Sequence, residues 1–219
     1  MKKQLDYLKK DLSQVFWIGG TACSGKTTIA GMLAQKHKLR VYHRDDHQRD
    51  HLMRATPENQ PTLHKAWANR ESWDVLYRQP AETVFEQAKA EAFEAFEFIV
   101  DDVLRMIDTP PLIAEGIGLF PELLAQVASP QRVIYFVASE GLARQTWTNR
   151  YKNTPWLEGY SEPEQVIEMF INLTLLNARY IQESAQRSGF KCVVSAVDGD
   201  ISDAFQLAEK RFESMLAYE

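Results

Sequence analysis

Lys26 and Thr27 close a glycine-rich stretch whose spacing is typical of a phosphate-binding loop. Residues 15–28 read VFWIGGTACSGKTT and fit the pattern G-x-x-x-x-G-K-[ST], with Gly20 and Gly25 as its glycines. A lysine at this place meets the β- and γ-phosphates of a nucleotide, and the hydroxyl that follows it is a ligand for Mg²⁺. We therefore expect Lys26 to face a bound phosphate from the surface of the loop, with Thr27 on the metal.

The residues on either side of the loop supply the elements that must position it. The apolar run before it suits a buried strand, and the TTIAGMLAQKH that follows carries Ile29, Met32 and Leu33 on one helical face. Backbone N–H groups and the helix N-terminus then converge on phosphate oxygens, which a chance glycine turn would not achieve. The residues expected around the nucleotide are Gly20, Thr21, Ala22, Cys23, Ser24, Gly25, Lys26, Thr27 and Thr28.

Cys23 lies inside the loop and has two interpretations, a small filler or a redox sensor. A sensor needs a lowered thiol pKa, for which the sequence offers no sign, so we favour the filler. Cys192 is far away in the sequence, which makes a disulfide implausible and fits a reducing compartment. We expect a cytoplasmic protein.

Composition limits the classes of protein that remain. A chain of 219 residues with 45% hydrophobic content can bury a core of its own, so residues 1–219 are expected to form a single domain. No apolar run is long enough for a membrane span, and the N-terminal MKKQLDYLKKDLSQ lacks the apolar core of a signal peptide. The net charge of −5 favours small substrates over nucleic acid, while the oligomeric state stays open.

Five short apolar runs alternate with helical patterns along the chain. Strands that alternate with helices predict an α/β fold of three layers, in which helices cover both faces of a parallel sheet. Ligands of such sheets bind beyond the C-terminal ends of the strands. The runs are Val15–Ile18, Leu39–Tyr42, Leu112–Ala114, Val133–Val137 and Lys191–Val194.

The stretch between the second and third runs is far longer than one crossover helix requires, which indicates a helical insert at about residues 58–107. Residues 64–79 resemble one or two short helices, and residues 81–107 one long amphipathic helix. An acceptor molecule could bind in this insert. Trp67, Trp73 and Tyr77 are candidates either for packing or for the walls of that site. The stripe that we expect in the core is Phe85, Ala88, Ala92, Phe96, Ile99, Val103 and Met106.

A helix, a loop and a second helix follow the fourth run and resemble a closing lid. Residues 139–149 look helical, and the proline and glycine of residues 151–160 predict a loop. Ser161 and Glu164 then form a capping-box pattern for a helix that ends near Arg187.

Basic residues cluster near this predicted lid. Arg144 and Arg150, with Lys152 behind them, are candidates for stabilising the charge on a transferred phosphoryl group, and Arg179 could point back toward the same place. Each of them alone would be more typical of a solvated surface.

A charged segment, HRDDHQRDH, follows the second run directly at residues 43–51. A phosphotransferase needs a carboxylate that accepts the proton of a hydroxyl and aims its oxygen, and Asp45 or Asp46 could provide it. The alternative is a solvated loop whose acids only cap the next helix.

Three histidines of this segment repeat at intervals of four residues. His43, His47 and His51 could therefore share a helical face and bind zinc. The expected position of His43 at the end of a strand breaks that spacing, so histidines at the surface or in contact with substrate are the default interpretation.

The third run ends in an acid, since residues 111–116 read PLIAEG and resemble a Walker B strand. Glu115 could hold Mg²⁺ through a water molecule or orient the acceptor. Its alternative role is to cap the helix expected near Pro121.

Two motifs, GTACSGKTT and Arg44-Asp45-Asp46, resemble the P-loop kinase superfamily in the branch that holds gluconate kinase, chloramphenicol phosphotransferase, zeta-type toxins and polynucleotide 5′-hydroxyl kinases. The resemblance implies a P-loop NTPase fold with strand order 2-3-1-4-5, ATP and Mg²⁺ as cofactors, Asp45 as the general base and Asp46 as a second acid. The polynucleotide kinases have an arginine two residues after the second aspartate, whereas this chain has Gln48 there and Arg49 one place further.

The expected function is transfer of the γ-phosphate of ATP to a hydroxyl of a small molecule. A nucleotide or nucleoside kinase is the alternative within the same fold. A binding switch that hydrolyses ATP slowly is the alternative of another class, and the insert and lid favour transfer over switching. ATP rather than GTP follows from the resemblance, since residues 133–195 hold no N-K-x-D-type motif.

Overall fold

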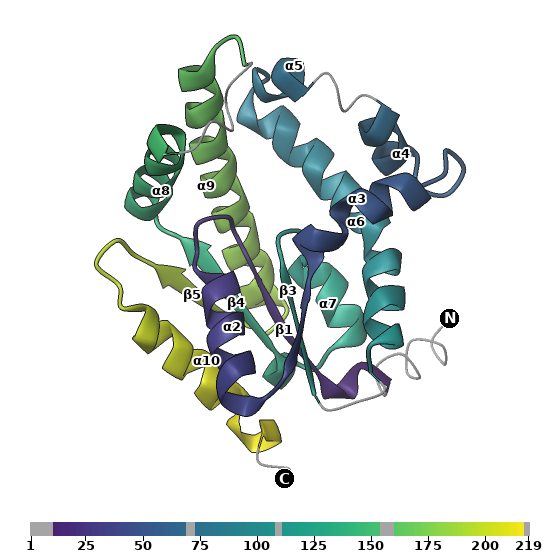
Figure 1. Cartoon of the computed structure of the whole chain (residues 1–219), viewed down its shortest axis with the longest axis vertical. Coiled ribbons are helices and arrows are strands. Elements are labelled where there is room, and N and C mark those ends of the chain that lie inside the picture. The colour runs from purple at the N-terminus through teal and green to yellow at the C-terminus, as the bar shows by residue number, and fades with distance from the viewer. Residues whose placement is uncertain (1–10, 69–72, 108–110, 154–159, 217–219) are drawn as a thin grey trace.

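A five-stranded parallel sheet forms the centre of the molecule (Figure 1), in the order β2-β3-β1-β4-β5. The computed structural model describes residues 11–68, 73–107, 111–153 and 160–216. The observed strand order confirms the predicted α/β class and the predicted order 2-3-1-4-5. The strands are β1 Val15–Gly20, β2 Arg40–His43, β3 Leu112–Gly116, β4 Val133–Ala138 and β5 Lys191–Ser195.

Helices cover both faces of this sheet, and its central strands are therefore buried on both sides. Trp17 of β1 packs in a cluster with helices α6, α7 and α9, whereas its neighbours Phe16 and Ile18 pack against α2 and α10. The remaining helices lie beyond the C-terminal ends of the strands (Figure 1). The helices are α2 Lys26–His37, α3 Arg44–Arg54, α4 Pro61–Ala68, α5 Trp73–Tyr77, α6 Ala81–Arg105, α7 Pro121–Val127, α8 Glu140–Asn153, α9 Pro163–Arg187 and α10 Ile201–Leu216, with 3₁₀ turns at Leu12–Gln14 and Pro130–Arg132.

The insert between β2 and β3 consists of α3 to α6, and its long helix α6 begins at the predicted residue. The apolar stripe of α6 is buried as expected at Phe85, Ala92, Phe96, Ile99 and Val103. The prediction is wrong at Ala88, which is exposed. A small side chain adds little to the width of the buried face, so the helix tolerates alanine on its solvent side.

The lid region differs from its prediction in two ways. Helix α8 continues to Asn153, so the predicted loop of residues 151–160 begins later, and residues 154–159 lie outside the described part of the chain. Helix α9 ends at Arg187 as predicted, but it has no side-chain cap at its N-terminus. The expected capping box is wrong because the Ser161 hydroxyl donates to Asp74 of α5 at 3.1 Å instead.

No helix in the described part of the chain combines the length and the apolar content needed to cross a bilayer.

Candidate active site

The glycine-rich loop joins β1 to α2 at the C-terminal edge of the sheet, and its backbone is shaped by positive φ angles. Cys23 and Gly25 have φ values of 64° and 82°. A β-carbon at Gly20 would collide with the carbonyl oxygen of Phe136, so only glycine fits beside β4. Left-handed residues between right-handed ones turn successive N–H groups toward one side, which is the geometry of an anion-binding nest.

Side chains of the loop anchor it to the neighbouring strands. The Thr21 hydroxyl accepts from the N–H of Ala138 at 2.8 Å, and the Ser24 hydroxyl donates to the Thr21 carbonyl at 2.9 Å. Ser195 of β5 donates to the Ser24 carbonyl at 2.9 Å. Thr21 and Ser24 therefore use their side chains on the scaffold, and any contact with a nucleotide is left to their backbone.

Lys26 is the first residue of α2 and is only 6% exposed, so the expectation of a surface-facing lysine is wrong. Within the described ranges no carboxylate forms an ion pair with its ammonium group. A buried cation without a counter-ion is costly by itself, and a bound phosphate would compensate for it.

Cys23 has the character of a filler. Burial raises the pKa of its thiol, and this effect outweighs the charges of Arg150 and Lys26 and a hydrogen bond with Thr146, all of which lower it. A thiol that stays protonated is a poor nucleophile.

Thr27 and Glu115 meet across the sheet edge, although 88 residues separate them in the sequence. The Thr27 hydroxyl lies 3.1 and 3.2 Å from the two carboxylate oxygens of Glu115. Glu115 is 3% exposed, and its other hydrogen-bond partner among the described residues is His43, whose Nδ1 lies 2.8 Å away. Hydroxyl and carboxylate oxygens beside a phosphate-binding loop suit Mg²⁺, so the residues present fit the ion that the fold implies.

Glu115→Gln is expected to raise the Mg²⁺ concentration needed for half of the ATP-dependent stabilisation by about 10-fold or more, because the amide lacks the carboxylate charge. A Mg²⁺ titration of the melting temperature at fixed ATP measures this effect. Glu213→Gln, on the exposed face of α10, is the matched control and should behave like the wild type. An unchanged Mg²⁺ requirement in Glu115→Gln would contradict the assignment.

The two aspartates lie in the first turn of α3, which begins directly after β2. Asp45 has a 55% exposed side chain, and its nearest cation is Arg44, with Nη1 3.6 Å from Oδ1. Residues three and seven places apart share a helix face, so Asp45 shares one with Gln48 and Leu52. Asp46 instead shares its face with Asp50 and Met53, which are exposed. The two aspartates therefore point to different surroundings.

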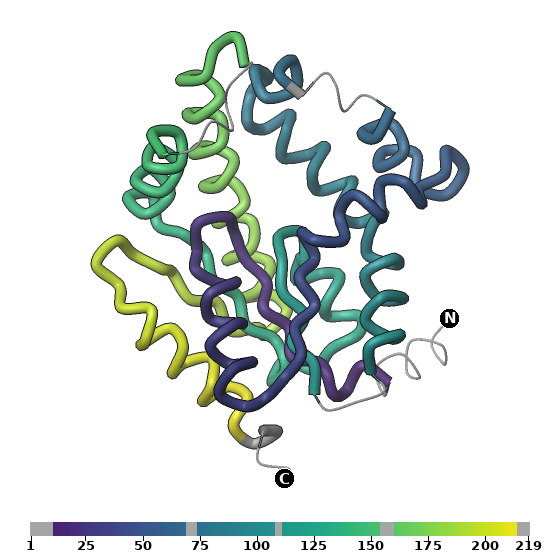
Figure 2. Tube along the Cα trace, in the orientation of Figure 1, coloured from purple at the N-terminus to yellow at the C-terminus, as the bar shows by residue number. Residues whose placement is uncertain are grey.

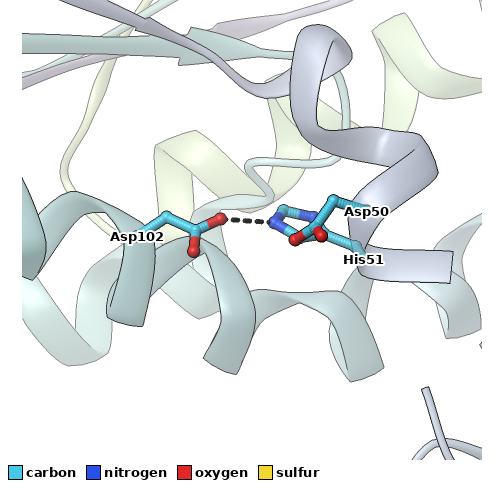
Figure 3. Close-up of side chains that lie close together, drawn as sticks. All are labelled: Asp50, His51 and Asp102. Atoms are coloured by element: carbon cyan, nitrogen blue, oxygen red, sulfur yellow. Dashed lines mark hydrogen bonds and ion pairs between the residues drawn. The ribbon is translucent and has the colours of Figure 1, made fainter. Parts of the chain in front are cut away.

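His51 and Asp102 form the centre of a buried polar network behind α3 (Figure 3). The Nε2 atom of His51 donates to Oδ2 of Asp102 at 2.7 Å, and Arg54 donates to the other oxygen at 3.0 Å. Burial would raise the pKa of Asp102, but the hydrogen bonds from His51 and Arg54 outweigh it and hold that pKa below its usual value. The network ties α3 to α6.

The histidine segment does not assemble a zinc site among the described residues. His43 binds Glu115, His51 binds Asp102, and His47 stacks on Tyr42 with ring centroids 4.5 Å apart. His51 is 1% exposed, so the default of surface histidines is wrong for this residue.

One group of possible metal ligands does lie in the described part of the chain, namely Asp50, His51 and Asp102 (Figure 3). The guanidinium of Arg54 already lies between its two carboxylates, 3.1 Å from Asp50 and 3.0 Å from Asp102. The arginine thus supplies the positive charge that a metal would supply.

The stability of the protein should rise with pH through the titration of His51. Burial lowers the pKa of His51, against the hydrogen bond and the charge of Asp102, which raise it. As pH falls below about 6.5, His51 therefore binds its proton in the unfolded chain before it does so in the folded protein. The free energy of unfolding then decreases by up to about 1.4 kcal/mol per pH unit.

This dependence can be measured by urea unfolding between pH 5 and 7. His51→Gln should flatten the slope, while the control His64→Gln, on a half-exposed part of α4, should keep it. A slope that His51→Gln leaves unchanged would show that other groups cause it.

The two predicted lid arginines lie in different surroundings on α8. Arg150 stands 5.0 Å from the ring of Trp147, and its charge lowers the pKa of Cys23, so it lies near the glycine-rich loop. Arg144 instead pairs with Glu168 of α9 at 2.7 Å. The structure therefore brings Arg150 to the loop, whereas Arg144 sits in a surface ion pair.

The lid and the insert meet at the start of α9, where Figure 2 shows the backbone of α5 beside it. Besides the bond from Ser161 to Asp74, Arg78, the residue after α5, lies 3.6 Å from Glu162. The ring of Tyr77 stacks at 6.2 Å on Tyr160. These contacts connect the start of α9, in the lid region, to α5 of the insert.

A pocket of about 940 Å³ lies inside the insert and is referred to below as the insert pocket. Its walls come from α3, α4, the region of α5 and α6, and they include Gln48, Leu52, Tyr77, Gln87 and Glu91. The expectation that the insert could hold an acceptor thus has a cavity to match.

The three aromatic candidates of the insert lie in different surroundings. Tyr77 lines the insert pocket, and Trp67 packs against a small apolar cluster that contains Leu52 and Leu63. The side chain of Trp73 lies outside the described part of the chain.

Sequence reasoning missed three residues of this region. His43 appeared only as a possible metal ligand, although β2 and β3 place it opposite Glu115 in register. That pairing could have been found from the strand order. Gln87 and Glu91 gave no signal, because polar residues four apart on an amphipathic helix are typical of a solvated face.

The sheet order 2-3-1-4-5, with a glycine-rich loop between its central strand and α2, is the arrangement of the P-loop NTPase fold. The chain therefore has a P-loop NTPase fold. No protein-family model matches it, and neither does any curated protein.

Two solved structures are similar to the chain. One is a shikimate kinase from Acinetobacter baumannii in complex with shikimate, 16% identical over 98% of each chain, with a TM-score of 0.45. The other is an uncharacterized protein from Eubacterium ventriosum, 12% identical over 91% of this chain and 98% of that chain, with a TM-score of 0.48. At these identities the likeness concerns the fold alone, so activity has to be inferred from the residues of this chain.

Proposed function

We propose that this protein is an ATP-dependent phosphotransferase that moves the γ-phosphate to a hydroxyl of a small molecule. The observation that carries the proposal is the insert pocket, whose wall includes Gln48 and Leu52 on the same helix face as Asp45. A nucleotide switch needs no cavity of this size in the helices of its insert. A phosphotransferase does need one, with a carboxylate at its edge.

The chemical step assigns a role to each group. Lys26 and the N–H groups of the loop bind the β- and γ-phosphates, and Arg150 approaches from α8 to neutralise charge that develops during transfer. Thr27 and Glu115 would hold Mg²⁺, which would supply positive charge that stabilises the charge developing on the transferred phosphoryl group. Asp45 accepts the proton of the acceptor hydroxyl while the hydroxyl oxygen bonds to the γ-phosphorus. The bond between the γ-phosphorus and the oxygen of the β-phosphate breaks, so ADP leaves.

ATP with Mg²⁺ is expected to raise the melting temperature by several degrees, since a ligand that binds only the folded state stabilises it by about 2.7 kcal/mol at 100 times its Kd. Differential scanning fluorimetry with and without EDTA measures the shift and its metal dependence. Lys26→Ala should lose most of the shift. No shift at millimolar ATP and Mg²⁺ would count against nucleotide binding and so against the whole proposal.

A further inference from the structure

The insert pocket contains one half-buried carboxylate, Glu91, that has no counter-ion. Gln87 donates to it at 2.9 Å, one turn away on α6. In the portion of the chain that is described, no lysine or arginine lies within ion-pair distance of Glu91. Burial raises the pKa of Glu91, and the hydrogen bond from Gln87 and the charge of Arg44 lower it only in part. The carboxylate therefore retains an unmet demand for hydrogen-bond donors.

The remaining polar groups of the pocket are mostly neutral. Gln48 and Gln79 both belong to the lining, and a side-chain amide can both donate to and accept from a hydroxyl. Among the described residues, the lining contains one cation, Lys65, which is exposed to solvent on α4. An anionic ligand would find one solvated lysine at the edge and the repulsion of Glu91 within.

About half of the lining is apolar. Leu52, Ala66 and Leu76 contribute to it, and Val75 has 54% of its surface exposed although it is a large apolar side chain. Apolar walls with a few polar groups, and a volume near 940 Å³, are typical of sites for drug-sized ligands.

We propose that the insert pocket takes an amphipathic acceptor of drug size that offers hydroxyl or amine donors to Glu91 and carries no anionic group. The inference rests on the proposed function, because it names the chemical class of that acceptor. It separates the alternatives that share this fold, since a nucleotide is anionic and a nucleoside is not.

Matched pairs of probes test the charge preference of the full-length protein. One set is 4-nitrophenyl β-D-glucoside, the corresponding glucosaminide and the corresponding glucuronide, which share an apolar body and differ in one group. The other pair is uridine and uridine 5′-monophosphate. Titration calorimetry with Mg²⁺ and a non-hydrolysable ATP analogue present measures each Kd, and the glucosaminide separates an amine donor from a hydroxyl donor.

We expect a neutral or amine-bearing probe to bind at least about 10-fold more tightly than its anionic partner. Glu91→Gln should weaken that probe by about 10-fold, because a charge-assisted hydrogen bond becomes a neutral one, and leave the affinity for the ATP analogue unchanged. Glu86→Gln, an exposed acid on the same helix, is the control and should bind like the wild type.

Equal or tighter binding of the anionic partner overturns the inference. An unchanged affinity of Glu91→Gln for the preferred probe also overturns it, and so does the absence of binding by every neutral and amine-bearing probe. In each of these cases the melting-temperature shift with ATP and Mg²⁺ still supports the proposed function. Loss of that shift would instead mean that the proposed function itself has failed.

Discussion

Lys26→Ala is expected to lower the rate of phosphoryl transfer by about 10²- to 10³-fold or more, because it removes the buried cation that follows the glycine-rich loop directly. The fold should survive. The side chain is buried without an ion pair among described residues, so its removal leaves no carboxylate uncompensated. Initial rates with labelled ATP, together with urea unfolding, measure both quantities.

Lys36→Ala is the matched control for this substitution. Lys36 lies on the same helix and pairs at the surface with Glu209 at 2.8 Å, so its loss removes one charge far from the loop. We expect nearly wild-type turnover from it. Turnover in Lys26→Ala within a few-fold of the wild type would end the kinase interpretation.

Asp45→Asn is expected to lower kcat by about 10²-fold or more, since asparagine keeps the size and one acceptor oxygen but cannot take the proton of the hydroxyl. The Kd for ATP should barely change, because Asp45 is assigned to the acceptor and not to the phosphates. The structural support for Asp45 is its position on the helix face that continues to Gln48 and Leu52 at the insert pocket.

Asp46→Asn is the built-in comparison, because Asp46 shares a helix face with exposed residues and should matter less. Turnover of both variants on any accepted substrate decides between them. If Asp46→Asn is inactive and Asp45→Asn is close to wild type, the two roles are exchanged. If neither variant loses activity, the acids only stabilise the N-terminus of α3.

The elements around the loop could be predicted because their signals are local. The apolar run before Gly20 and the helical pattern after Thr28 each follow from a short window of sequence, and the structure has β1 and α2 at those places. The burial of Lys26 could not be predicted in this way. It depends on how distant parts of the chain pack around the loop, and neither composition nor periodicity carries that information.

Contacts between distant segments explain the other failures. Ser161 followed by Glu164 satisfies a capping pattern, yet Asp74 of α5 competes for the Ser161 hydroxyl from elsewhere in the chain. His51 looked like part of a polar segment, but α6 brings Asp102 within hydrogen-bond distance and makes burial tolerable. The contact between Glu115 and Thr27 depends on the order of the strands in the sheet. That order was implied by the resemblance to a family and not by any local pattern of residues.

The most direct test of the central claim follows the label of γ-labelled ATP in the presence of Mg²⁺ and the donor-bearing acceptors described above. The products are separated into inorganic phosphate and organic phosphate, with Asp45→Asn as the comparison. We expect label in an organic product whose formation depends on the acceptor and falls by about 10²-fold in Asp45→Asn. Label released only as inorganic phosphate, at a rate that no acceptor changes, would contradict it and indicate a nucleotide-hydrolysing switch.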